Sequence, residues 1–134
     1  MKIKKLLVSL FSVLLVFCAV PNSQAVVWSE MEWKVQICSW LKNREMGCIR
    51  GHMNCLTRRN NLCRAIGIVK KYYLLWRRTG EFSYKNLNDD LHSIWGLDEE
   101  IEKSLEVSKT LSELYDNLQN MEKAYYRVAD DLSL

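Results

Sequence analysis

The chain has 134 residues, of which 49% are hydrophobic and 26% are charged, with 5 glycines and 1 proline. This length suits one domain, and the composition excludes collagen-like, low-complexity and disordered chains. Few glycines and prolines, together with long periodic apolar patterns, favour helices over a turn-rich β-sandwich. The formal net charge is +3, and the lysines Lys2, Lys4 and Lys5 near the N-terminus account for all of it.

Residues 1–25 have the pattern of a secretory signal peptide. The N-terminal lysines precede an apolar run over residues 6–20, and residues 23–25 form a small-x-small cleavage site. A membrane-spanning helix needs about 20 apolar residues, more than this run supplies before Pro21. Lipid attachment at Cys18 is a weaker alternative, because Phe17 stands where the bacterial lipoprotein pattern has a small residue. We therefore predict an exported protein, periplasmic or secreted, whose mature part (residues 26–134) is one helical domain.

Four cysteines follow this segment, namely Cys38, Cys48, Cys55 and Cys63. An even number of cysteines in a small exported chain predicts two disulfides. If the flanking segments are helices, bridges from Cys38 to Cys48 or from Cys55 to Cys63 would exceed the reach of about 7 Å. The crossed pairing does not suit one antiparallel register. A helical hairpin that turns near Gly51 suits the nested pairing, so we predict bridges from Cys38 to Cys63 and from Cys48 to Cys55.

Over residues 38–63 this pattern resembles the twin-cysteine helical hairpins of the coiled-coil-helix type. The spacings here are C-x9-C and C-x7-C, and the second departs from the twin C-x9-C pattern of those hairpins, so we infer no family membership. The rival interpretation is a tetrahedral zinc site formed by Cys48, His52, Cys55 and Cys63. That site needs thiolates in a compartment that oxidises them, so we predict disulfides, no metal and no cofactor.

Two helices are predicted in the first half of the mature chain. The first covers residues 29–45, where Ser29 and Glu32 form a capping box and Trp28 can pack on Trp33. It has two apolar faces, one formed by Met31, Val35 and Leu41 around Cys38, and the other by Trp33, Ile37 and Trp40. The second helix covers residues 54–79, ends at Gly80, and carries a packing seam of Leu62, Ile66, Val69, Tyr73 and Trp76.

The second half predicts a short helix and a long one. The short helix covers residues 84–95, stops at Gly96, and turns Leu87, Leu91 and Ile94 inward. The long helix covers residues 98–131 with a coiled-coil-like seam of Val107, Leu111, Leu114, Leu118, Met121, Tyr125, Val128 and Leu132. Thr110 and Glu113 can also cap a new helix, so a break near Ser108 is the alternative. The predicted fold class is all-α: a disulfide-stapled antiparallel helical hairpin packed with a short helix and a long C-terminal coiled-coil-like helix.

Charge divides the mature chain into two halves. Residues 26–80 contain 11 Lys or Arg and 3 acidic residues, whereas residues 81–134 contain 13 acidic and 5 basic residues. Pairing of the halves within the fold, or simple solvation, is the expected outcome. Two outward lines of charge at sevenfold spacing are nevertheless predicted, namely Arg64, Lys71 and Arg78 on one helix and Glu99, Glu106 and Glu113 on another. With the interleaved aromatic residues, the predicted partner-binding set is Arg64, Lys71, Arg78, Tyr72 and Trp76.

The sequence lacks the motifs of common enzyme classes, including the P-loop, the nucleotide-binding glycine fingerprint, G-x-S-x-G and H-E-x-x-H. We predict no enzyme activity. We expect an exported helical protein-interaction module, such as an accessory of an envelope or secretion assembly, that binds a protein partner or itself and does not bind nucleic acid. The alternative is a membrane-active secreted effector that uses the basic aromatic helix 54–79 on an anionic membrane surface.

Overall fold

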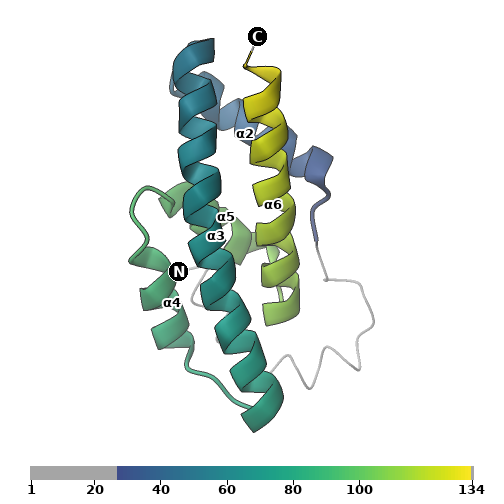
Figure 1. Ribbon diagram of the computed structural model, residues 1–134. Helices are drawn as coiled ribbons and strands as arrows, with labels where there is room; N and C mark the ends of the chain where they lie inside the picture. The colour runs from purple at the N-terminus through teal and green to yellow at the C-terminus, as the bar shows by residue number, and fades with distance from the viewer. Residues whose placement is uncertain (1–26, 134) are drawn as a thin grey trace.

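The computed structural model describes residues 27–133, so the predicted signal peptide and Cys18 lie outside the described residues. Five helices and no strand occur in this range, which confirms the all-α class (Figure 1). The helices are α2 (Glu30–Asn43), α3 (Cys48–Thr79), α4 (Tyr84–His92), α5 (Asp98–Val107) and α6 (Leu111–Asp131).

Helix α6 is the centre of the packing. It lies side by side with α3 in the opposite direction, and this pair makes the most extensive contact in the described chain (Figure 1). Helix α2 crosses behind these two helices and packs mainly on α6. Helix α4 packs on α3, and α5 links α4 to α6. The predicted antiparallel pairing of the first two helices is therefore wrong, because α6 is the main partner of both.

Helix α2 begins as the sequence predicts. The Ser29 hydroxyl accepts the Glu32 N–H at 3.1 Å, and the Glu32 carboxylate accepts the Ser29 N–H at 3.0 Å, which completes the capping box. The Trp28 and Trp33 rings lie 4.6 Å apart, between their centroids. The buried face consists of Trp33, Ile37 and Leu41.

The other predicted apolar face of α2, formed by Met31, Val35 and Leu41 around Cys38, is buried only at Leu41. Met31 and Val35 are each 65% exposed. Helix α2 has one extensive helical partner, so it needs only one apolar face.

The turn between α2 and α3 lies before Cys48, so Gly51 lies inside the first turns of α3 and not in the predicted bend. A Cβ atom at Gly51 would stand 3.0 Å from Cδ1 of Leu132. The missing side chain of Gly51 therefore allows the C-terminal end of α6 to lie close to α3. At the other end of α3, Gly80 has φ +80° and donates its N–H to the Trp76 carbonyl at 2.7 Å, as predicted for a glycine that ends a helix.

The acidic half contains a helix break between α5 and α6. The Thr110 hydroxyl accepts the Glu113 N–H at 3.1 Å and caps α6, so the alternative of a new helix after Ser108 is confirmed. Leu111, Leu118 and Tyr125 of the predicted seam are buried, and so are the inward positions of α4, namely Leu87, Leu91 and Ile94.

A buried asparagine fixes how α2 lies on α6. The Asn117 side-chain oxygen accepts the backbone N–H of Trp28 at 2.8 Å and the indole N–H of Trp33 at 3.3 Å. The Asn117 amide also donates to the Ser108 hydroxyl at 2.9 Å. Because Asn117 is fully buried, it would be costly to leave without these partners. One side chain thus joins the start of α2 to the α5–α6 break.

Candidate functional site

The described cysteines are free thiols, so the predicted disulfides are not seen. Cys48 and Cys55 both lie in α3, about two turns and about 10 Å apart along its axis, beyond the reach of about 7 Å of a disulfide. The hairpin that would have joined Cys38 to Cys63 is replaced by packing on α6. There the Cys63 thiol donates to the Glu122 carboxylate at 2.6 Å.

The environments of these thiols differ. Burial, and after it the nearby Cys38, raise the pKa of the fully buried Cys55 to about 11. The hydrogen bond to Glu122 is the main cause that raises the pKa of Cys63. Among residues 27–133 no group of His, Cys, Asp and Glu side chains could hold a metal ion. The rival zinc site is therefore wrong, since Cys48 and Cys63 lie about 22 Å apart on one helix.

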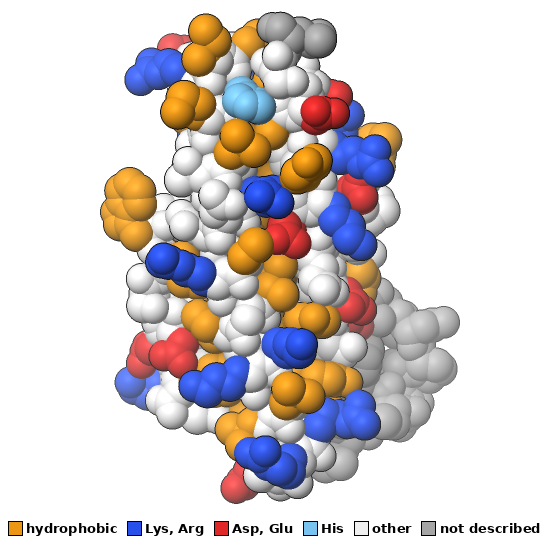
Figure 2. Space-filling view, in the orientation of Figure 1, with side chains coloured by type: hydrophobic (Ala, Val, Ile, Leu, Met, Phe, Trp, Pro, Cys, Tyr) orange, Lys and Arg blue, Asp and Glu red, His pale blue; other side chains and the backbone are white. Residues whose placement is uncertain are grey.

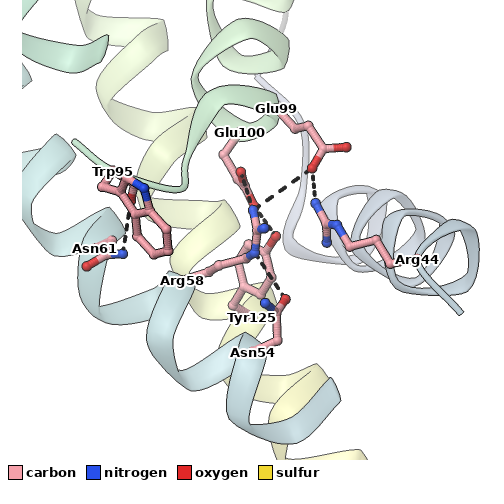
Figure 3. Close-up of polar contacts among 8 residues, drawn as sticks. All are labelled: Arg44, Asn54, Arg58, Asn61, Trp95, Glu99, Glu100 and Tyr125. Atoms are coloured by element: carbon pink, nitrogen blue, oxygen red, sulfur yellow. Dashed lines mark hydrogen bonds and ion pairs between the residues drawn. The ribbon is translucent and has the colours of Figure 1, made fainter. Parts of the chain in front are cut away.

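A charged network is buried where α3, α5 and α6 meet (Figure 3). Glu100 is fully buried, and its two oxygens accept hydrogen bonds from Nη1 of Arg58 at 2.9 and 2.7 Å. The Tyr125 hydroxyl donates to the same carboxylate, and the Arg58 Nε–H donates to Asn54 at 3.0 Å. Burial, followed by the Glu100 charge, holds the pKa of Tyr125 well above its usual value. We call Arg58, Glu100 and Tyr125 the buried network.

The buried network continues to the surface through a second ion pair. Arg44, just after α2, pairs with Glu99, and Arg58 lies 4.0 Å from the same Glu99 carboxylate (Figure 3). Basic side chains from the first half of the chain thus meet acidic side chains from the second half. Part of the charge asymmetry is neutralised inside the fold, as expected from the sequence.

The side of α3 that faces away from the buried network carries exposed cations. A groove of about 460 Å³ runs along α3 and is lined by Gly67, Lys70, Lys71, Leu74, Leu75 and Arg78. We call Arg64, Lys70, Lys71 and Arg78 the outer cations. All are exposed, and none forms an ion pair with an acidic side chain in residues 27–133. Figure 2 shows Lys and Arg side chains spaced along this side of the molecule.

The residues of the predicted partner-binding set differ in their exposure. Arg64, Lys71 and Arg78 face solvent as predicted. Tyr72 is only 8% exposed, and its hydroxyl donates to the Asp90 carboxylate at 2.6 Å. Burial, and then this bond, raise the pKa of Tyr72 to about 12. Trp76 is half-buried beside the core. Tyr72 is therefore not a surface residue, because its position falls on the face that packs on α4.

The predicted outward line of glutamates is not a free acidic surface. Glu113 is buried, and its carboxylate accepts the Lys109 N–H at 2.6 Å. Glu106 pairs with Lys103 at 3.1 Å, and Glu99 pairs with Arg44. The prediction was wrong for Glu113 because the helix break places it in the first turn of α6, where an acidic side chain serves the helix start.

A separate cavity of about 400 Å³ lies between the end of α3 and the start of α6. Its lining residues are Tyr73, Trp76, Arg77, Phe82, Thr110, Leu111 and Ser112. The Tyr73 and Trp76 rings are 6.1 Å apart, and the Arg77 guanidinium lies 5.8 Å from the Tyr73 ring centroid. Tyr73 and Trp76 were predicted to lie in the core seam of this helix. The cavity has no local signature in the sequence, because its opposite wall comes from residues far along the chain.

No protein-family model, no curated protein and no solved structure matches this chain. In the described part of the chain, no helix combines the length and the apolar character required to cross a membrane.

Proposed function

We propose that the protein is an exported helical interaction module that binds an acidic segment of a partner protein along the groove of α3. The observation that carries this proposal is the position of the outer cations. Arg64, Lys71 and Arg78 lie opposite the face of α3 that contains Cys55, Leu62, Ala65 and Val69 of the core, and Lys70 lies at its side. Exposed cations that form no ion pair within residues 27–133 are available to a partner of opposite charge.

Gly67 supports the same proposal. It lies in the middle of α3 and lines the groove, and a Cβ atom added there would meet nothing within 4 Å. Glycine inside a helix costs about 1 kcal/mol relative to alanine. Nothing within the described chain requires that cost, whereas a bare backbone allows another chain to approach closely between Arg64, Lys70 and Lys71.

The groove favours a polar partner over a membrane. A helix that lies in a membrane surface needs an extended apolar stripe beside its cations. Ile49 and Met53 are exposed near the start of α3, at 78% and 64%. Between Arg64 and Arg78, Leu74 is the one large hydrophobic residue that is strongly exposed, at 53%, so no apolar stripe continues beside the outer cations. The aromatic residues that would have anchored this helix in lipid, Tyr72 and Trp76, turn toward the core.

To test the proposal, the purified protein is titrated with a helical peptide of alternating Glu and Ala blocks, and the affinity is measured by isothermal titration calorimetry. A Gln and Ala peptide of equal length is the neutral comparison, and phosphatidylglycerol vesicles are the membrane comparison. We expect binding to the Glu peptide only, with an affinity that falls as salt rises. Replacement of Arg64, Lys71 and Arg78 by Gln should weaken binding about tenfold or more, which corresponds to about 1.4 kcal/mol.

The matched control replaces Lys42, Lys85 and Lys123 by Gln, which removes the same charge from exposed positions on α2, α4 and α6. Equal losses in the two triple variants would mean that net charge alone drives binding. Binding to vesicles but not to the peptide would support the membrane-active alternative and overturn the proposal.

A further inference from the structure

We propose that the cavity between α3 and α6 binds a small organic carboxylate with a flat aromatic body. This inference is independent of the acidic partner proposed for the α3 groove. It stands on the shape of the cavity, on its aromatic walls and on the positive groups at its edge.

The size and the walls of the cavity suit a small molecule. Its volume of about 400 Å³ falls within the range of about 300–1,000 Å³ of small-molecule sites. Tyr73 and Trp76 of α3 and Phe82 of the α3–α4 loop give it aromatic walls, and Leu111 adds an aliphatic surface. Aromatic walls with tilted rings favour a flat ring system that can pack against one face and meet the edge of another.

The one charged side chain that lines this cavity is the guanidinium of Arg77. Arg77 donates one N–H from Nη1 to the Tyr73 hydroxyl at 3.1 Å, and forms no ion pair with an acidic side chain in residues 27–133. The guanidinium keeps further N–H groups for a ligand. A carboxylate can accept two of them in parallel, which gives both affinity and orientation.

The start of α6 adds to this positive character. Leu111 and Ser112 are the first two residues of α6, and both line the cavity. The Thr110 cap takes the N–H of Glu113, so the first two N–H groups of the helix are left for another acceptor. The acidic side chain of this turn, Glu113, accepts the Lys109 N–H. A carboxylate on the ligand can thus lie between Arg77 and the N–H groups of Leu111 and Ser112.

The test uses 2-naphthoate as the probe and 2-naphthamide as its neutral counterpart. Isothermal titration calorimetry measures affinity, and backbone amide NMR shifts of the full chain report where each compound binds. We expect 2-naphthoate to shift the amide signals of Leu111 and Ser112, and we expect 2-naphthamide to bind about tenfold more weakly, a difference of about 1.4 kcal/mol.

Adjacent arginines provide a matched pair of variants. Arg77→Gln should reduce the affinity for 2-naphthoate to that of 2-naphthamide, whereas Arg78→Gln, which removes the same charge from the α3 groove, should leave it unchanged. Ser112→Phe should fill the cavity and abolish binding of both compounds, with circular dichroism confirming a folded protein.

Three outcomes would overturn the inference. These are no binding of 2-naphthoate, equal affinities for the acid and the amide, or equal losses in Arg77→Gln and Arg78→Gln. None of them bears on the acidic partner of the α3 groove, which is tested with another probe, the Glu and Ala peptide.

Discussion

The two sides of α3 use the same residue types for different purposes. On the inner side, Arg58 meets a fully buried carboxylate, Glu100, and a tyrosine hydroxyl. On the outer side, Arg64, Lys71 and Arg78 project from the helix with no acidic side chain of residues 27–133 beside them. A buried ion pair must be complete, since a lone charge in the interior is strongly unfavourable. An exposed cation contributes little to folding and can be used for binding.

The charge asymmetry of the sequence therefore has two components. One is internal, where Arg44 and Arg58 of the basic half meet Glu99 and Glu100 of the acidic half. The other is external, where Lys70, Lys71 and Arg78 line one groove and Arg64 is exposed on the same helix. Substitutions on the two sides should therefore separate stability from binding.

The largest effect is expected for Glu100→Gln. This change removes the buried carboxylate that lies 2.7 Å from Arg58 and leaves only the more distant Glu99, at 4.0 Å. Removing one partner of a buried pair costs about 3–5 kcal/mol of the free energy of unfolding. Urea denaturation followed by circular dichroism measures it. The neighbouring Glu99→Gln is the control, because Glu99 is half exposed and should cost about 1 kcal/mol or less. Similar losses in both variants would show that Glu100 has no special role.

An intermediate effect is expected for Tyr72→Phe at alkaline pH. The pKa of Tyr72 is raised to about 12 in the folded protein, above the usual value of about 10 in an unfolded chain. The folded state thus holds this proton more tightly, so its contribution to stability is complete below about pH 10 and decreases as pH rises toward about 12. Between pH 9 and pH 12, the wild type should lose more stability than Tyr72→Phe. Parallel curves for the two proteins would contradict this environment for Tyr72.

Thiol reactivity distinguishes an inward from an outward cysteine on α3. Cys55 is fully buried, and its pKa is raised to about 11. The thiolate is the form that reacts with iodoacetamide. At pH 8 the reagent should therefore label Cys48 and Cys38 first, and Cys55 only after denaturation. Peptide mass spectrometry identifies each labelled site. Cysteines that resist alkylation even in denaturant, and react only after reduction, would instead restore the disulfides that the sequence predicts.

The smallest effect on stability is expected for Gly67→Ala. Because a Cβ atom meets nothing there, the free energy of unfolding should rise by up to about 1 kcal/mol. Binding of the Glu and Ala peptide should weaken in the same variant, because the new methyl group stands in the groove. A stabilised protein with unchanged binding would remove Gly67 from the proposed interface.

Much of the fold could be predicted from local sequence signals. The capping box at Ser29, the end of α3 at Gly80 and the buried face of α6 each depend on residues close in the chain, so pattern and spacing predict them. The pairing of helices depends on contacts between distant residues. The predicted hairpin of the first two helices was wrong because the cysteine spacing was assumed to reflect disulfides. In the structure, α2 and α3 each pack mainly on α6.

The candidate sites were predictable only in part. The line of Arg64, Lys71 and Arg78 follows from a sevenfold spacing on one helix, and the structure places it outward. The buried network was missed, because Arg58 and Glu100 are brought together by the fold and neither has a local signature. An isolated glycine inside a helical pattern, Gly67, was the available signal for the groove.

The central claim is that the two sides of α3 divide stability from binding, and a crossed comparison of Arg58→Gln with Arg78→Gln tests it most directly. Both variants remove one arginine from the same helix. Each would be measured for its free energy of unfolding and for its affinity for the Glu and Ala peptide. Arg58→Gln should lose about 3 kcal/mol of stability and keep its affinity. Arg78→Gln should keep its stability within about 0.5 kcal/mol and bind the peptide several-fold more weakly. If both variants lose stability alike, or if Arg58→Gln weakens binding as much as Arg78→Gln does, the division is contradicted.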